Sequence, residues 1–370
     1  MNRRLLLAGV GLLATLSSPL LRADDDSEED RDAGQFIYTM SNAVAANQVM
    51  VYQRMTAGVL SPVGAVATGG KGSGAGLGSQ GSLVLSGSHS WLLAVNAGSD
   101  DISVFRVTST GLSLASRTAS GGHMPISVTI AGRAVYVLNA GTPNNITGFT
   151  LGHDGSLTPI ANSTASLSGP SVGPAQVQFD ADGDQLVVTE KGTSMIDVFT
   201  VAHNGALGNR VSTLSHGMTP FGFAFGRKNR IFVSEAFGGG TNASAASSYN
   251  LSSAGTVQTI SGSIGTQQTA ACWLVVDPSG RYAYTTNTGS NTVSLFRIAS
   301  DGSLTLVSSI AGSTPTGGPI DATFSADGRY LHVLTGGAAS IVTFQVQANG
   351  SLVSFSTAMA PASAAGLAAQ

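Results

Sequence analysis

A few polar residues have the side-chain types that acid–base chemistry requires. The carboxylates of Glu190 and Asp321 are candidates for a catalytic base, because a carboxyl group shielded from water has a pKa closer to neutrality. Gln176 and Lys191 could donate hydrogen bonds to an oxyanion that develops during such a reaction. The candidates for contact with a bound ligand are Gln176, Lys191, Glu235, Trp273 and Asn287. These residues suit either catalysis by proton transfer or the binding of a polar ligand.

Each candidate also has a structural interpretation that involves no chemistry. Glu190 and Lys191 are neighbours and could form a solvated ion pair, which contributes little to stability. Glu235 could bind backbone amides of its own loop, and Asn287 lies in an Asn-x-Gly turn. Trp273 could pack against apolar neighbours instead of a ligand. The sequence leaves both interpretations open.

Metal and cofactor sites are not predicted. Cys272 is the only cysteine, and no His-x-x-x-His or His-Glu-x-x-His pattern occurs. The glycine-rich stretches 72–76 and 78–81 neither follow a strand nor begin a helix, so they do not match a phosphate-binding loop. The stretch 69–82 that contains them is expected to be a long, flexible entry into the next structural unit. We therefore expect no bound metal and no cofactor.

The elements that would position these residues come from an internal repeat. Residues 271–313 are its clearest copy, with four short apolar runs separated by Pro-Ser-Gly, Asn-x-Gly and Asp-Gly turns. Asn, Asp and Gly accept the positive φ angles that let antiparallel strands reverse direction. Further copies span residues 35–67, 80–120, 125–166, 174–215, 220–262 and 319–356. Such a repeat predicts a ring of four-stranded antiparallel sheets.

The first copy, residues 35–67, has only three of the four strands. The segment from Gly366 to Ala369 is the obvious supplier of the missing inner strand. Its pairing with the first copy would close the ring and leave no exposed edge there. We therefore predict an all-β fold, a single seven-bladed β-propeller over residues 34–370 with four-stranded antiparallel blades and the C-terminal strand in blade 1.

The repeat also predicts which residues lie together. If each inner strand begins at one face, here called the top face, the links into the inner strands and the loops between second and third strands gather there. Gln176, Trp273 and Asp321 occupy equivalent positions near the start of their inner strands, around the mouth of the central channel. The neighbouring loops contain Glu190, Lys191, Glu235 and Asn287. A polar, partly acidic funnel is therefore expected on the top face.

The N-terminus has the features of an export signal. Two arginines precede an almost purely apolar run over residues 5–16, and Ala23 offers a small residue at a cleavage site. A membrane anchor is the alternative, although the apolar run is short for a membrane span. We expect a signal peptide over residues 1–23 and an acidic, disordered leader over residues 24–33. The mature chain would have no transmembrane segment and would be periplasmic or extracellular.

The balance of charge excludes one class of partner. The chain has 17 Lys and Arg residues against 20 Asp and Glu residues. The predicted signal peptide contains three of the basic residues, which leaves 14 against 20 and a net charge near −6. No nucleic-acid partner is expected, because binding to phosphates requires a basic surface.

The repeat resembles one known family. Residues Phe324–Tyr330 have the pattern F-x-x-D-G-R-Y, and residues Asn287–Phe296 have the pattern N-x-G-S-N-x-V-S-x-F. With these motifs the chain is similar to the lactonase-type seven-bladed propellers, the superfamily that includes bacterial 6-phosphogluconolactonase, and it looks like an exported subgroup. The similarity covers nearly all of the mature chain. It implies the fold more strongly than an activity, since one propeller fold supports many functions.

Few of the family's catalytic residues are present at the matching positions of this chain, so the resemblance does not imply the family's activity. The 6-phosphogluconolactonases have a histidine near the start of an inner strand, where this chain has Gln176. They also have an arginine after the Asn of an Asn-x-Gly loop, where this chain has Thr288. Only Glu190 matches an acidic residue of the family. Without the base and the cation, proton transfer and charge stabilisation are both lost, so hydrolysis of 6-phosphogluconolactone is not expected.

Two functions remain. The first is an exported scaffold that binds a ligand or a protein through the top-face funnel. The alternative is a hydrolase or cyclase acting on a sugar lactone or related cyclic ester, with Glu190 or Asp321 as the base. A buried carboxyl group with a raised pKa would favour catalysis. The expected partner is an unknown small molecule of the lactone or carbohydrate class, or a protein, and the closed ring favours a monomer.

Overall fold

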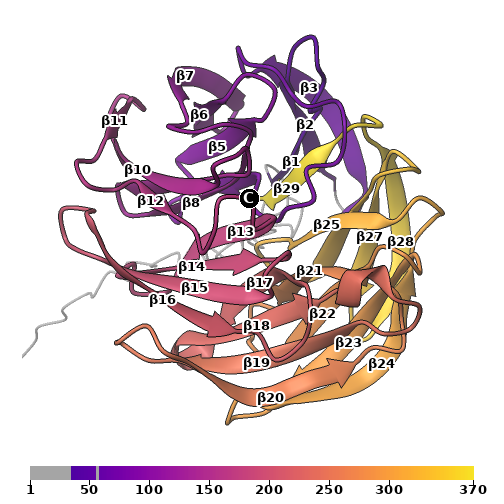
Figure 1. The fold of residues 1–370 in the computed structure, drawn as a ribbon. Helices are drawn as coiled ribbons and strands as arrows, with labels where there is room; N and C mark the ends of the chain where they lie inside the picture. The colour runs from indigo at the N-terminus through magenta and orange to yellow at the C-terminus, as the bar shows by residue number, and fades with distance from the viewer. Residues whose placement is uncertain (1–34, 56–57) are drawn as a thin grey trace, which may run out of the picture.

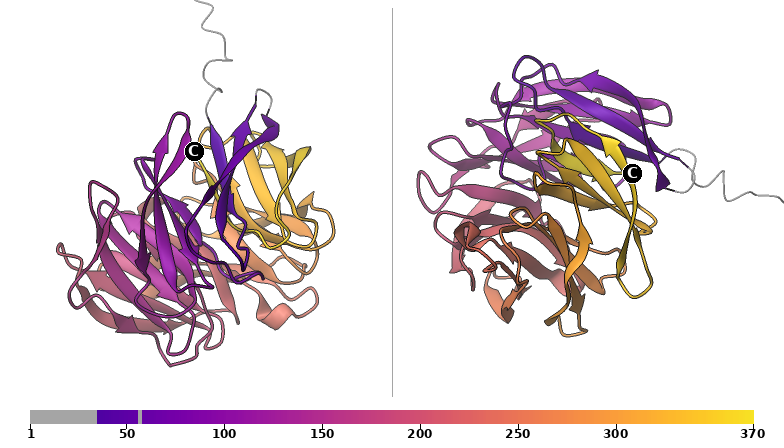
Figure 2. Two further views of the ribbon diagram at one scale, coloured as in Figure 1. Left: turned by 90° about the horizontal axis from the view of Figure 1, so that it is seen from above. Right: turned by 90° about the vertical axis from the view of Figure 1, so that its right-hand side faces the viewer.

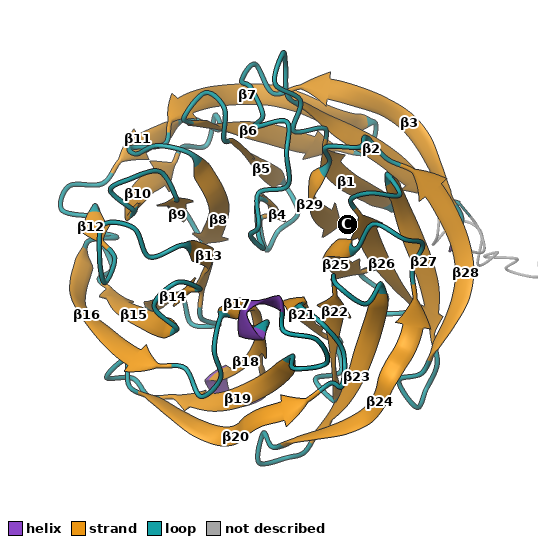
Figure 3. Cartoon of the chain, turned by 45° about the vertical axis from the view of Figure 1, so that its right-hand side comes forward, coloured by secondary structure: helices purple, strands orange, loops and turns teal. Residues whose placement is uncertain are grey.

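The computed structural model describes residues 35–55 and 58–370. The predicted signal peptide and acidic leader lie outside the described residues. Within these residues the strands form seven antiparallel sheets, arranged as blades around a central axis (Figures 1 and 3). Six sheets have four strands, and the third has its outermost position divided between two short strands that both pair with the strand inside them. The predicted seven-bladed propeller is confirmed.

Three blades contain the N-terminal half of the ring, and the strands of each are named from the inner edge outward. Blade 1 contains β29 (Ala365–Ala369), β1 (Phe36–Met40), β2 (Gln48–Arg54) and β3 (Leu60–Ala67). Blade 2 contains β4 (Leu83–Leu85), β5 (Trp91–Asn96), β6 (Asp101–Thr108) and β7 (Gly111–Ala119). Blade 3 contains β8 (Pro125–Ala131), β9 (Ala134–Asn139), β10 (Asn145–Leu151), β11 (Leu157–Pro159) and β12 (Ala165–Ser166).

The remaining four blades follow the chain in the same way. Blade 4 contains β13 (Pro174–Phe179), β14 (Gln185–Glu190), β15 (Met195–Val201) and β16 (Leu207–Leu214). Blade 5 contains β17 (Pro220–Gly226), β18 (Arg230–Glu235), β19 (Ala245–Leu251) and β20 (Val257–Gly265). Blade 6 contains β21 (Ala271–Val276), β22 (Tyr282–Asn287), β23 (Thr292–Ile298) and β24 (Leu304–Ser313). Blade 7 contains β25 (Pro319–Phe324), β26 (Tyr330–Thr335), β27 (Ser340–Val346) and β28 (Leu352–Met359).

Turns that contain an aspartate and a glycine connect the first and second strands of blades 4, 6 and 7. In blade 4, Asp180 Oδ1 accepts hydrogen bonds from the backbone N–H groups of Gly183, at 2.9 Å, and Gln185, at 3.1 Å. Gly183 has a φ of 76°, in the left-handed region that glycine enters without steric cost. Asp277 accepts bonds from the N–H groups of Arg281 and Tyr282 in the equivalent turn of blade 6. The side chain thus satisfies amides that the reversal leaves without a strand partner.

The C-terminal strand closes the ring as predicted. β29 pairs with β1 in antiparallel register, with Ile37 opposite Ala369 and Thr39 opposite Leu367, and Figures 1 and 2 show the C-terminal strand beside the first described strand. Gly366 has a φ of 78°, and a Cβ there would lie 2.7 Å from Ser82 Oγ. This position therefore requires glycine, because the closing strand approaches the entry of blade 2 too closely for a side chain.

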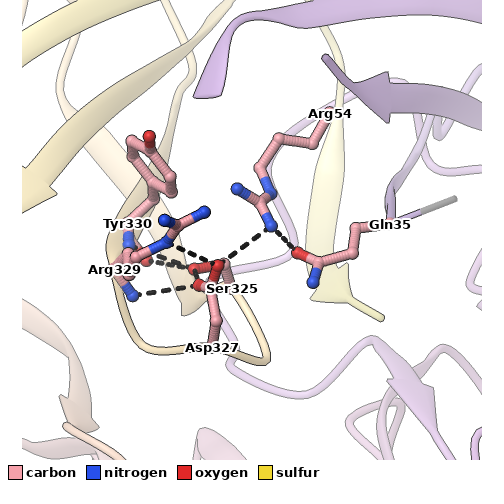
Figure 4. Close-up of polar contacts among 6 residues, drawn as sticks. All are labelled: Gln35, Arg54, Ser325, Asp327, Arg329 and Tyr330. Atoms are coloured by element: carbon pink, nitrogen blue, oxygen red, sulfur yellow. Dashed lines mark hydrogen bonds and ion pairs between the residues drawn. The ribbon is translucent and has the colours of Figure 1, made fainter. Parts of the chain in front are cut away.

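A buried arginine also joins blade 1 to blade 7. Arg54, at the end of β2, is almost fully buried and contacts the side chain of Gln35 and Asp327 Oδ2, the latter at 3.0 Å (Figure 4). Its guanidinium lies 5.1 Å from the centre of the Tyr330 ring. Arg329 donates to the same Asp327 oxygen at 3.0 Å. A charge buried in this way is tolerated because carboxylate and aromatic partners surround it.

The core lies between adjacent blades. The second and third strands have mostly buried residues, whereas outer strands such as β16 alternate between exposed and half-buried positions. Tyrosines of the second strands reach the next blade: the Tyr284 hydroxyl donates to Gly350 O at 2.6 Å, and Tyr136 likewise bonds Gly205 O. No helix in the described part of the chain is long and apolar enough to cross a membrane.

Candidate functional site

A cavity with a volume of about 760 Å³ lies along the central axis, lined by residues of the inner strands. It extends from Gln80 at one end to the first-to-second-strand turns, near Asp182 and Pro278, at the other. Its lining contains Gln176 and Asp321 but not the other five predicted site residues. Among the described residues that line it there are three aspartates and no lysine or arginine. The channel wall is therefore polar and acidic, without a cation that could pair with a phosphate.

Side chains near the start of the inner strands join one blade to the next. Gln176 Oε1 accepts a hydrogen bond from Phe223 N at 2.7 Å, and its Nε2 donates to Phe223 O at 3.0 Å. In the preceding blade, Ser127 Oγ accepts a bond from Val177 N at 3.1 Å. An inner strand is the edge of its sheet and has unpaired backbone groups, which these side chains satisfy. Ser127 and Gln176 thus occupy equivalent positions in their blades, and the polar groups of both side chains bond the backbone of the next inner strand.

Gln80 bonds the backbone of the blade 6 inner strand in the same way, because blade 5 has a glycine at the equivalent position. Its Oε1 accepts from Leu274 N at 3.1 Å and its Nε2 donates to Leu274 O at 2.9 Å. Gly222, at the equivalent position of blade 5, leaves room for this amide, because a Cβ there would lie 2.0 Å from Gln80 Oε1. Gln80 was not among the residues predicted from the sequence. The signal that could have found it is the glycine at a position where other blades have a polar side chain.

The segment around Gln80 therefore crosses one end of the channel. Gln80 N donates to Ala175 O at 3.1 Å, and the indole N–H of Trp273 donates to Ser79 O at 3.0 Å. Ser79 and Gln80 lie in the stretch 69–82 that was expected to be flexible, and here they are hydrogen-bonded to blades 4 and 6. The cavity extends toward the turns at the opposite end of the channel.

Lys191 and Trp273 meet beneath this crossing segment. Lys191 Nζ donates to Gly78 O and lies 4.6 Å from the centre of the Phe221 ring, which packs at 5.0 Å from the Trp273 ring. Burial lowers the pKa of Lys191 to about 8. Cys272 is close enough for the ammonium to lower the pKa of its thiol, although burial raises that pKa overall. The structure brings these predicted residues together, outside the channel lining.

Asp321 is the buried carboxyl group on the channel wall. Its Oδ1 accepts a hydrogen bond from Ala322 N at 2.8 Å, and the backbone N–H of Leu367 in β29 also interacts with the carboxyl group. Burial dominates over these two donors and raises the pKa of Asp321 to about 8. The group is therefore mostly protonated at neutral pH and can donate a hydrogen bond or a proton.

The ends of the second strands form a second set of equivalent positions, all buried. The residues there in blades 2 to 6 are Asn96, Asn139, Glu190, Glu235 and Asn287. Each bonds groups of its own blade or the preceding link. Asn287 Nδ2, for example, donates to Ser294 Oγ at 2.8 Å. The sequence predictions of ligand or catalytic roles for three of them stay predictions, since none lines the channel.

Glu190 lies beside a second buried carboxyl group, Asp197 of β15. Glu190 accepts from Ser168 N at 2.9 Å and from the hydroxyls of Ser168 and Thr193. Asp197 Oδ1 accepts from Ser212 Oγ at 2.6 Å. Burial, reinforced by the neighbouring Glu190, raises the pKa of Asp197 to about 7. Asp197 was not predicted from the sequence, where its acidic side chain inside the apolar strand pattern Met-Ile-Asp-Val-Phe was the available signal.

Glu235 offers a direct test of a structural role. Its carboxylate accepts from Gly217 N at 2.8 Å, from Ser263 Oγ at 2.7 Å and from the Ser247 hydroxyl. Glu235→Ala would leave these buried donors without an acceptor, so we expect the free energy of unfolding to fall by about 3 kcal/mol. Glu235→Gln keeps one acceptor oxygen and should lose less. Urea unfolding measures both; a loss below about 1 kcal/mol for Glu235→Ala would contradict the structural role.

Residues 35–55 and 58–370 contain no group of three or more His, Cys, Asp or Glu side chains placed to hold a metal ion.

Comparison with known proteins gives one family. The family model described as "Lactonase, 7-bladed beta-propeller" matches residues 30–172 and 173–366. No curated protein matches the chain significantly.

Solved structures with the same architecture come from several bacteria. A putative 6-phosphogluconolactonase from Bacteroides fragilis has a TM-score of 0.71 and 17% identity, with 91% of this chain and 98% of that chain covered. The periplasmic gluconolactonase of Pseudomonas aeruginosa has a TM-score of 0.71 and 16% identity, with 90% and 99% covered. A protein from Lactobacillus plantarum has a TM-score of 0.73 and 17% identity, with 91% and 99% covered. At this level of identity the likeness concerns the fold.

Proposed function

Because the chain belongs to the lactonase family of seven-bladed β-propellers, we propose that it is an exported binding scaffold that holds a neutral, hydroxyl-rich small molecule of the sugar or sugar-lactone class in its central channel. The observation that carries the proposal is the cavity of about 760 Å³ with an amide- and carboxyl-bearing wall and no lysine or arginine in its described lining. Its size is within the range of small-molecule sites.

The residues of the wall favour hydroxyl groups over phosphate. Gln178 and Thr129 line the cavity with Asp321, so the wall offers amide, hydroxyl and carboxyl groups. A sugar hydroxyl both donates and accepts, which suits a protonated Asp321 as well as the amide of Gln178. A phosphate would meet the carboxylates of Asp180 and Asp182 and no lysine or arginine in the described lining. Hydrolysis of 6-phosphogluconolactone is therefore not part of the proposed function.

A binding role is favoured over catalysis because neither of the two expected oxyanion donors, Gln176 and Lys191, is available in the channel. Both ends of the Gln176 amide bond Phe223, so this amide is not available as an oxyanion donor. Lys191, the second proposed donor, does not line the channel. One observation favours the alternative function of lactone hydrolysis: Asp321 is buried with a pKa of about 8, in the range of a group that transfers protons near neutrality.

The export part of the proposal rests on the predicted signal peptide over residues 1–23. The name of the Pseudomonas aeruginosa structure places that protein in the periplasm, and its fold covers nearly the whole of the present chain. Fractionation of cells that produce the full chain tests the proposal: the protein should be found outside the cytoplasm, shortened by the signal peptide. A full-length protein in the cytoplasmic fraction would contradict it.

Ligand binding is tested by thermal unfolding of the purified protein with glucono-lactone, gluconate, neutral oligosaccharides and 6-phosphogluconate. A neutral ligand at 100 times its Kd should add about 2.7 kcal/mol to the free energy of unfolding. Gln178→Ala, a change on the channel wall, should reduce the shift. No shift with any neutral compound would overturn the proposal. Acid release from the lactone that disappears in Asp321→Asn would establish the alternative.

A further inference from the structure

A basic cleft lies between blades 5 and 6 on the side of the first-to-second-strand turns. Its volume is about 390 Å³, and four cations line it together with Phe232 and Ile298: Arg227, Lys228, Arg230 and Arg281. The whole chain has only 17 lysines and arginines and a net charge of −3, so this cleft is a local exception to an acidic protein. We propose that the cleft binds the carboxylate groups of an acidic carbohydrate.

The four cations have no carboxylate partner within 4 Å among the described residues. Arg230 Nη1 donates to Ser300 O at 2.7 Å and Arg281 Nε donates to Ser279 Oγ at 3.0 Å, both neutral oxygens. By contrast, Arg117 forms an ion pair with Asp101, at 3.1 Å. Arg227 and Lys228 are exposed, and their side chains make no hydrogen bond in the described part of the chain. The donors of the cleft are therefore available to an anion.

The acidic groups nearest to the cleft are already engaged. Asp277 accepts from the backbone N–H groups of its own turn. Asp301 accepts from Ser303 N at 2.9 Å, and the hydrogen bonds of Ser303 lower its pKa first, with a smaller contribution from Arg230. Neither aspartate lines the cleft. Guanidinium groups match a carboxylate with two parallel hydrogen bonds, which makes a carboxylate the natural occupant.

The backbone between β17 and β18 places two of these cations at the rim. Gly226 and Arg230 are paired, so residues 227–229 form a three-residue connection. Lys228 has a φ of 60° and Asn229 a φ of 55°, in the left-handed region, which asparagine tolerates and lysine enters less often. Asn229 Nδ2 donates to Asp180 Oδ2 at 2.8 Å and holds the turn in place. The turn therefore holds the exposed side chains of Arg227 and Lys228 at the rim of the cleft.

The cleft and the channel lie on either side of a third hollow. A pocket of about 390 Å³ lies between them: it shares Val276 and Pro278 with the channel cavity, and it shares Arg227 and Gly280 with the cleft. An extended ligand could therefore place a neutral part in the channel, which has no cation in its described lining, and its carboxylates in the cleft. The choice of a carbohydrate rests on the proposed function, whereas the preference for an anion rests on the cleft alone.

The test compares a trimer of galacturonic acid with neutral maltotriose by isothermal titration calorimetry at low and high salt. We expect the acidic trimer to bind more tightly and to weaken as salt increases, because salt screens the charge interaction. Arg227→Ala/Arg281→Ala should weaken its binding at least tenfold and leave binding of maltotriose unchanged. Lys71→Ala/Arg106→Ala removes the same charge from the blade 2 side of the ring and should leave both affinities unchanged.

The outcomes separate the cleft from the channel. If Arg227→Ala/Arg281→Ala leaves the affinity for the acidic trimer unchanged, the proposed anion site in the cleft is wrong, whether or not maltotriose binds. Binding of the acidic trimer that depends on these two arginines, with no binding of maltotriose, supports the cleft and contradicts the proposed function. Displacement of the acidic trimer by an equal concentration of inorganic phosphate would indicate a site for any small anion and would overturn the assignment to a carbohydrate.

Discussion

A chain that ends at Ala360 is expected to lose cooperative folding, although it lacks only ten residues. Without β29, blade 1 has no inner strand and β1 becomes an open edge. Leu367 is buried between blades 1 and 7, and burial of such a side chain contributes about 1.5–3 kcal/mol. Adding the buried alanines of β29 and the strand pairing gives a loss comparable with the whole stability of a domain, about 5–15 kcal/mol.

Circular dichroism and urea unfolding measure this loss, with removal of Gln370 alone as the matched control. Gln370 N donates to Phe36 O at 2.8 Å, and Gln370 Oε1 accepts from the Tyr38 hydroxyl at 3.1 Å. The control removes only these two bonds at the end of the strand and should unfold nearly as the full chain does. A peptide of residues 361–370 added to the shortened chain should restore part of the native signal, because the open edge of β1 can accept a strand. A shortened chain with an unchanged urea midpoint would refute the proposed importance of closure.

The sequence predicts this fold well because the repeat encodes it several times. The same ring is indicated by the Asp-Gly turns, by the alternation of apolar residues and by the missing strand of the first copy. Where one copy of the repeat is ambiguous, the clearer copies show how to interpret it. The supply of the missing strand by residues near Gly366 follows from counting strands. Three of the predicted copies begin where the inner strands begin, at Pro174, Pro220 and Pro319.

The functional site was predicted less completely, because one sequence position does not reveal the direction of its side chain. Glu235 and Asn287 are at the predicted loops of the repeat, but their side chains bond groups of their own blade or of the link before it. Gln80 closes the channel through an interaction with Leu274, which is distant in the sequence. The basic cleft was not predicted for the same reason: Arg227 and Arg281 belong to different copies of the repeat and meet only where blades 5 and 6 pack together.

The second large effect is expected at Asp321, whose substitution by asparagine should make the protein more stable at alkaline pH. The pKa of this carboxyl group is about 8 in the folded protein, against an ordinary value of 3.8. The stability that it contributes is therefore fully present below pH 3.8 and is lost as the pH rises from there through 8. The loss is about 1.4 kcal/mol for each pH unit in this window. The amide of Asp321→Asn would not titrate, while its oxygen could still accept from Ala322 N.

The measurement is the difference in unfolding free energy between Asp321→Asn and the natural protein at pH 5, 7 and 9. The contributions of other titrating groups cancel in this difference. Asp197, whose pKa is raised to about 7, destabilises both proteins as the pH rises. His332, whose pKa is lowered by burial to about 3, destabilises both proteins as the pH falls from 6.5. We expect the difference to grow by several kcal/mol in favour of Asp321→Asn between pH 5 and 9. Asp197→Asn is the control for a buried carboxyl group away from the channel. A difference independent of pH would mean that Asp321 is charged and hydrated in the channel, and it would remove the protonated carboxyl group from the proposed ligand site.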